Sequence, residues 1–143
     1  MILMTRVTAR DFRAAFSRCL SGRPRGPAPP IVVRFAGGTR TIACTTGDGV
    51  VLTHTTPADE RDDLLVLPAD FLADVEGGPD EAVTLERPSK LRGVLHWHAG
   101  TKPRTLPVEM LLPGRHHELP QPPVLTPIPA KVLDALHEVT AHV

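Results

Sequence analysis

Aromatic residues and cysteines are scarce in this chain of 143 residues, which contains no tyrosine, one tryptophan, four phenylalanines and two cysteines. Cys19 and Cys44 are too few for a disulfide framework and match no zinc-binding spacing. Apolar runs of membrane-spanning length are absent, and Arg6 follows the opening MILM too soon for a secretory signal peptide. These absences predict a cytoplasmic protein with no membrane partner, one main domain and a core of Val, Leu and Ile.

Turn-forming residues are abundant, with sixteen prolines and eleven glycines. They separate short runs rich in β-branched and apolar residues, a pattern typical of antiparallel strands joined by tight turns. Gly37-Gly38, between two such runs, is a hairpin signal. The predicted strands cover residues 2–7, 31–35, 39–45, 50–56, 64–67, 81–86, 91–98 and 104–106.

A helix with one apolar and one basic face is predicted close to the N-terminus. Thr8 and Asp11 have the spacing of an N-terminal capping box, so this helix should begin near Ala9. At about 100° per residue, apolar side chains fall on one arc and arginines on the opposite side. The apolar arc contains Phe12, Phe16, Cys19 and Leu20, and the basic side contains Arg10, Arg13 and Arg18, with Arg23 and Arg25 in the loop that follows.

Two further helices are predicted. Residues 68–78 begin with proline, carry acids in the early turns and end at Gly77-Gly78, which fits a short helix. Residues 109–124 are rich in proline and leucine with little periodicity and are interpreted as an extended linker. The third helix follows Pro129 and has an apolar face made of Val132, Leu133, Leu136, Val139 and Thr140.

Charge is balanced overall but unevenly distributed. The net charge is zero, yet residues 1–45 hold eight arginines and one acid, whereas residues 46–86 hold eleven acids and one base. A polyanion responds to the local field and not to the sum, so zero net charge does not exclude nucleic acid. The basic face of the first helix therefore has two interpretations, a solvated surface or a surface that binds a polyanion.

The sequence contains no arrangement typical of catalysis. Neither Cys19 nor Cys44 lies in a recognisable nucleophile motif, and the glycine-rich turns lack the lysine of a phosphate-binding loop. His96 and His98 would share one face of a strand, as a zinc pair could require, but only residues 116–118 offer a third ligand, from the linker. We therefore predict no enzyme activity, no cofactor and no metal.

The order of these segments resembles the bacterial DNA polymerase III beta subunit, the sliding clamp, over its first domain and the opening helix of its second. The resemblance is collinear along nearly the whole chain and rests on no single specific motif. It is carried by MTRVTARDFRAAFSRCL, GRPRGPAPPIVV, LLVLPADFLADV, EAVTLE, TKPRTLPVEMLLPGRHHELPQPP and TPIPAKVLDAL.

This resemblance implies an α+β, DNA-clamp-like domain of two short helices packed on two small antiparallel sheets. Residues 1–110 would form that domain, residues 111–126 a linker, and residues 127–143 a helix like the start of a second clamp domain. Clamps place such helices around duplex DNA, so Arg10, Arg13, Arg23 and Arg25 would contact phosphates without sequence specificity. Self-association into a ring, and binding of DNA polymerase or a clamp loader, would follow from the same resemblance.

The second helix departs from the clamp pattern. Clamps usually place a basic residue after Pro-Ala, whereas this chain has Asp70, followed by Asp74 and Glu76. Three acids without a base are a poor lining for a DNA channel. An alternative function is therefore a protein-interaction module that kept the clamp fold and lost DNA binding.

Overall fold

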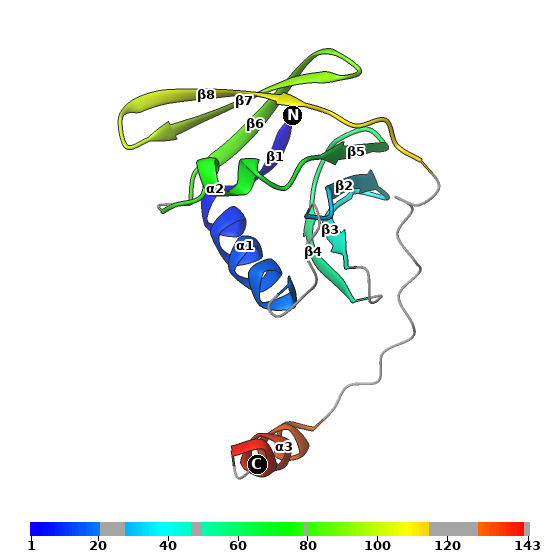
Figure 1. The fold of residues 1–143 in the computed structure, drawn as a ribbon, viewed down its shortest axis with the longest axis vertical. Coiled ribbons are helices and arrows are strands. Elements are labelled where there is room, and N and C mark those ends of the chain that lie inside the picture. The colour runs from blue at the N-terminus through cyan, green and yellow to red at the C-terminus, as the bar shows by residue number, and fades with distance from the viewer. Residues whose placement is uncertain (21–27, 47–49, 79, 115–128, 142–143) are drawn as a thin grey trace.

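The structure, a computed structural model, describes residues 1–20, 28–46, 50–78, 80–114 and 129–141 (Figure 1). These residues form eight strands and three helices in an order close to the predicted one. The elements are β1 (Ile2–Thr5), α1 (Arg6–Leu20), β2 (Ile31–Ala36), β3 (Thr39–Thr45), β4 (Val51–Pro57), β5 (Asp63–Leu67), α2 (Phe71–Val75), β6 (Ala82–Ser89), β7 (Arg92–Ala99), β8 (Lys102–Glu109) and α3 (Ala130–Ala141).

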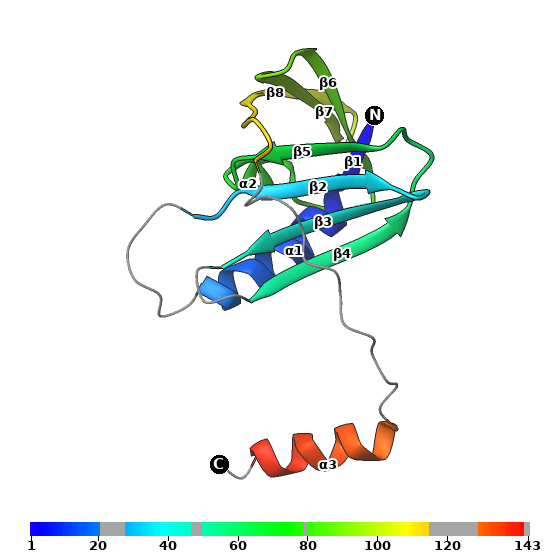
Figure 2. The same ribbon diagram turned by 90° about the vertical axis from the view of Figure 1, so that its right-hand side faces the viewer.

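The strands form two antiparallel sheets of four strands each. One sheet has the order β1-β6-β7-β8 and the other has the order β4-β3-β2-β5. α1 contacts α2, β1 and β4. It is therefore a neighbour of α2 and touches both sheets (Figures 1 and 2). The α+β class with two antiparallel sheets is therefore as predicted.

The strands bury every second side chain in one core, which is shared by both sheets, α1 and α2. In β2, Ile31, Val33 and Phe35 point into this core, and in β7 Leu95 and Trp97 do so. A strand exposes every second side chain to the opposite face, so apolar residues at alternate positions gather on one side. Trp97 is buried, as expected of a core residue.

α1 begins three residues before the predicted start. The Thr5 hydroxyl oxygen accepts a hydrogen bond from the Thr8 backbone N–H at 3.1 Å, so Thr5 caps the helix and Thr8 lies in its first turn. The predicted Thr8–Asp11 capping box is therefore wrong. Thr5 has the better position because the last residue of β1 already presents its side chain where the chain turns into the helix.

The predicted hairpin between β2 and β3 is confirmed. Ala36 pairs with Thr39, which leaves Gly37 and Gly38 as a two-residue loop. Both glycines have positive φ angles, 58° and 76°, as the common two-residue hairpin turn requires. Substitution by a residue with a Cβ atom would strain this turn.

β8 is longer than predicted, because it continues through two prolines. It pairs with β7 from Lys102 to Glu109, whereas only residues 104–106 were expected. Proline cannot donate to a strand ladder and is normally a strand breaker. Here Pro103 and Pro107 are tolerated because β8 is an edge strand whose proline nitrogens face away from β7.

The packed body extends slightly past position 110, and α3 lies apart from the sheets (Figures 1 and 2). Met110 is buried, and Leu111 forms a β-bridge with Val66 of β5. α3 exposes four apolar side chains, Val132, Leu133, Leu136 and Val139. None of the helices in the described ranges is long and apolar enough to cross a membrane.

Candidate nucleic-acid interface

The face of α1 opposite the core carries the two predicted arginines that the structure describes. Phe12 and Phe16 are buried, and the helical period places Arg10 and Arg13 on the other side. Their side chains are 54% and 46% exposed. Arg18, in the last turn, is exposed as well. The predicted Arg23 and Arg25 lie outside the described residues.

Both arginines have a carboxylate partner on the surface. Arg10 Nε lies 3.2 Å from Asp11 Oδ1, and Arg13 Nη1 donates to Glu76 Oε1 at 2.9 Å. Glu76 directly follows α2 and comes from a distant part of the sequence. The local pair could be anticipated from neighbouring charges, whereas nothing in the sequence pattern brings Glu76 to Arg13.

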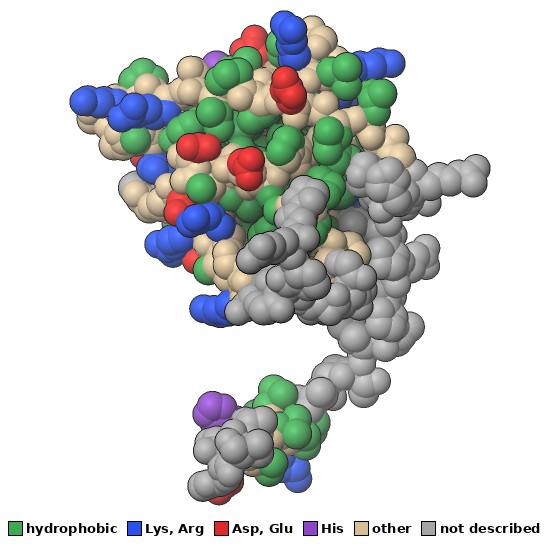
Figure 3. Space-filling view, viewed as in Figure 1, with side chains coloured by type: hydrophobic (Ala, Val, Ile, Leu, Met, Phe, Trp, Pro, Cys, Tyr) green, Lys and Arg blue, Asp and Glu red, His purple; other side chains and the backbone are tan. Residues whose placement is uncertain are grey.

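Exposed acids on α2 lie next to this basic face. Asp70 precedes the helix and Asp74 is within it, and both are exposed. Figure 3 shows red side chains over α2 and blue ones over α1, on the same side of the molecule. The combined surface is therefore mixed in charge, with its positive part on α1.

Arg6 fixes the position of α1 relative to the elements around it, a role that no sequence pattern predicted. Its guanidinium donates to three backbone carbonyls, those of Val75 at 3.0 Å, Glu76 at 3.1 Å and His98 at 3.2 Å. The first two end α2 and the third lies near the turn between β7 and β8. Because these acceptors are distant in sequence, no local signal could have identified this arginine.

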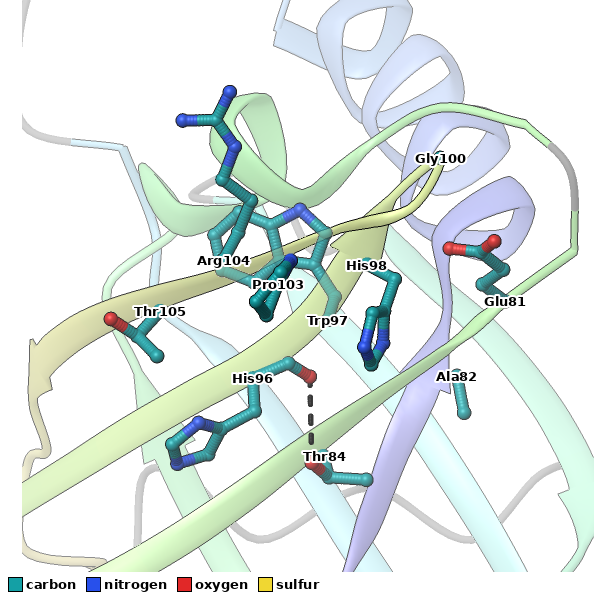
Figure 4. A pocket seen from close by; sticks show the side chains of 10 residues that line it. All are labelled: Glu81, Ala82, Thr84, His96, Trp97, His98, Gly100, Pro103, Arg104 and Thr105. Atoms are coloured by element: carbon teal, nitrogen blue, oxygen red, sulfur yellow. Dashed lines mark hydrogen bonds between the residues drawn. The ribbon is translucent and has the colours of Figure 1, made fainter.

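A second candidate site is a hollow of about 570 Å³ on the β6-β7-β8 sheet, lined by ten residues including His96, His98 and Arg104 (Figure 4). His96 Nε2 lies 3.0 Å from Glu86 Oε2, and the Thr84 hydroxyl donates to the His96 carbonyl. Among the residues that the structure describes, no three His, Cys, Asp or Glu side chains could hold a metal ion. The two histidines therefore form no metal centre with a described third ligand.

The cysteines do not form a reactive pair. Cys44 is buried and Cys19 is partly exposed, and both are free. Burial, with a smaller contribution from Cys19, raises the pKa of the Cys44 thiol to about 11. The thiol is thus protonated at neutral pH and is a weak nucleophile.

Comparison with known proteins identifies no relative: no family model, curated protein or solved structure matches the chain. Function must therefore be inferred from the chain itself, and the clamp resemblance stays a prediction.

Proposed function

We propose that this chain is a sliding-clamp-like domain that binds the phosphate backbone of duplex DNA through the exposed face of α1, without reading sequence. The proposal combines the resemblance in the sequence with the arrangement of the elements. Two short helices lie side by side against two four-stranded sheets, as a clamp-like domain requires.

The observation that carries this proposal is the exposure of Arg10 and Arg13 on one helix face. Arginine binds phosphate through a planar fork of donors. Two arginines one turn apart can contact successive phosphates while the buried side of α1 keeps the helix in place. Such contacts position a duplex but carry no base information.

The ion pairs on this face are a modest obstacle to DNA binding. An exposed pair of this kind contributes roughly 0–1 kcal/mol, because water and salt screen it. Arg13 can therefore exchange the Glu76 carboxylate for a phosphate at small cost. The charge of Glu76 remains nearby after the exchange and weakens the attraction.

The test is a fluorescence titration of a labelled duplex with the double variant Arg10→Glu, Arg13→Glu. We expect duplex affinity at low salt to fall by roughly tenfold or more, and the slope of log Kd against log salt to decrease by about 2, since each lost phosphate contact removes about 0.9. Two duplexes of unrelated sequence should give the same dissociation constant. Glu76→Gln should tighten binding because it removes a competing negative charge.

A matched control is the double variant Lys90→Glu, Arg92→Glu. Both residues are exposed near the turn between β6 and β7, and the change in net charge is the same. This variant should bind DNA nearly as well as the unmodified chain. Equal losses in the two double variants would mean that only total charge matters and would refute a site on α1.

A second candidate function is a protein-interaction module that kept a clamp-like fold and lost DNA binding. The acids Asp70, Asp74 and Glu76 beside α1 favour it, because they repel phosphate. It predicts that the unmodified chain ignores duplex DNA even at low salt. That result would replace the first proposal by the second.

Further parts of the proposal follow from the resemblance alone. Residues 1–110 would be the clamp-like domain, and α3 would open a second one. The domain would act in DNA replication as a processivity factor in the cytoplasm, without enzyme activity, and would meet DNA polymerase or a clamp loader. Binding of these partners can be measured with the same purified chain.

A further inference from the structure

The two sheets have four edge strands, and the structure tells which of them can accept another strand. In an antiparallel sheet the backbone N–H and C=O groups of successive residues point alternately to the two sides of a strand. At an edge, every second residue therefore presents free groups outward. Natural proteins usually block such edges with proline, bulges, charged side chains or a covering segment.

β8 is blocked by proline. The Met110 N–H donates to the Leu91 carbonyl, so even-numbered residues in this register face β7 and odd-numbered residues face outward. Pro103 and Pro107 are odd-numbered and have no N–H. An incoming strand would therefore find two donors missing on this edge.

β5 and β1 are covered by other groups. On β5, the Val66 carbonyl accepts from the Leu111 N–H at 2.9 Å, and the Leu64 N–H donates to the Asp63 carboxylate at 2.8 Å. On β1, the Ile2 carbonyl accepts from the Arg40 guanidinium at 2.8 Å, and the register shifts between Ile2 and Met4. Neither strand offers a regular row of free groups.

β4 is the remaining edge, and its described residues carry no such protection before Pro57. The Thr46 N–H donates to the Val50 carbonyl and the Ala58 N–H to the Gly38 carbonyl, so even-numbered residues face β3. Val51, Thr53 and Thr55 consequently direct their N–H and C=O groups outward. The register with β3 is regular along the whole strand.

We propose that β4 is an interaction surface for a second copy of this chain, paired with β4 of that copy about a two-fold axis at Thr53. Thr53 would face Thr53 of the second copy, and Val51 would face Thr55 on each side of the axis. Each of these three pairs exchanges two backbone hydrogen bonds, about six in all. The two sheets would join into one continuous antiparallel sheet.

Chemistry on this edge favours a second copy over other occupants. β4 contains no acid, lysine or arginine, so two copies meet no like charges. Val50 and Val51 are 43% and 37% exposed at the start of the strand and would be covered by pairing. Pairing of β4 with β8 of another copy would lose the donors of Pro103 and Pro107, which leaves about four hydrogen bonds.

The two-fold axis has a consequence for the helices. Antiparallel pairing within one sheet keeps the same face of both copies on the same side. α1 contacts β4, and a hollow of about 200 Å³ lies between them, lined by seven residues that include Phe12, Ala15 and Thr53. Both copies of α1 would therefore lie on one face of the joined sheet.

The experiment is the native mass of the full chain by light scattering, without DNA, so that its result is independent of the proposed DNA binding. We expect twice the 15.5 kDa of one chain. Thr53→Pro removes an outward N–H of β4 and should give a monomer. Thr105→Pro makes the same change on the outward side of β8 and should leave the dimer intact.

A charge-pairing experiment tests the axis and covers the case in which Thr53→Pro fails to fold. Thr53→Lys and Thr53→Glu should each be monomeric, because like charges meet across the axis, and an equal mixture of the two should form a dimer. A monomeric unmodified chain, as expected if β4 pairs with a strand of another protein, would overturn the proposal. So would an assembly that Thr105→Pro disrupts and Thr53→Pro does not.

Discussion

Replacing Arg6 by alanine should destabilise the body more than any other single arginine change on α1. The change removes three hydrogen bonds from one guanidinium, to the carbonyls of Val75, Glu76 and His98. A hydrogen bond to a charged group contributes about 1.5–3 kcal/mol, but Arg6 is half-buried and water can replace part of the set. We therefore expect the free energy of unfolding to fall by about 2–4 kcal/mol.

The measurement is urea unfolding followed by circular dichroism, with Arg18→Ala as the matched control. Arg18 is exposed in the last turn of the same helix, so its loss should change the free energy of unfolding by no more than about 0.5 kcal/mol. Arg6→Lys keeps the charge but not the fork of donors, and should recover only part of the loss. A loss of less than about 1 kcal/mol for Arg6→Ala would refute the view that this side chain holds α1, α2 and the β7–β8 turn together.

Gly77 offers an independent check on the same contact. A Cβ atom at this position would lie 2.5 Å from Arg6 Nη2, so Gly77→Ala should displace the guanidinium. The double variant Gly77→Ala, Arg6→Ala should then lose less stability than the sum of the single changes, because both remove the same hydrogen bonds. Additive losses would show that the glycine acts through something other than Arg6.

Two further changes test the core. Gly93→Ala should lower the free energy of unfolding in urea by about 1–3 kcal/mol, because the new Cβ atom would lie 2.8 Å from Leu85 Cδ1 and 3.2 Å from Met110 Sδ. An unchanged free energy of unfolding would contradict the close packing of β7. The buried Cys44 thiol has a pKa raised from 9.0 to about 11, so its contribution to stability is present below pH 9 and should be lost, by at most about 3 kcal/mol, as pH rises to 11. Cys44→Ala should remove this pH dependence, and its persistence would assign the effect to another group.

Most of the fold could be predicted from the sequence because its strongest signals are local. Alternating apolar residues, a glycine pair between two strands and a proline before a short amphipathic run each act within a few residues. The errors also have local causes. Thr8 and Thr5 both have a side chain that can cap α1, and only the end of β1 decides between them.

The candidate site was less predictable, because charge pairing depends on tertiary structure. Helical periodicity correctly placed Arg10 and Arg13 on an exposed face. Arg13 pairs with the Glu76 carboxylate, and Arg6 donates to the Val75 carbonyl. Both partners are more than sixty positions away in the sequence. A pattern read along the chain cannot identify such partners.

The prolines of β8 connect these observations to the question of assembly. Proline is unfavourable in a central strand, and the strand predicted at residues 104–106 stops short of both Pro103 and Pro107. On an edge the same residue leaves the internal ladder intact and removes a donor from the outer side. A head-to-tail ring joins two different edges of each domain, whereas a two-fold dimer uses one edge twice. Because β8 is blocked and β4 is open, the dimer retains more backbone hydrogen bonds than a head-to-tail contact between these two strands.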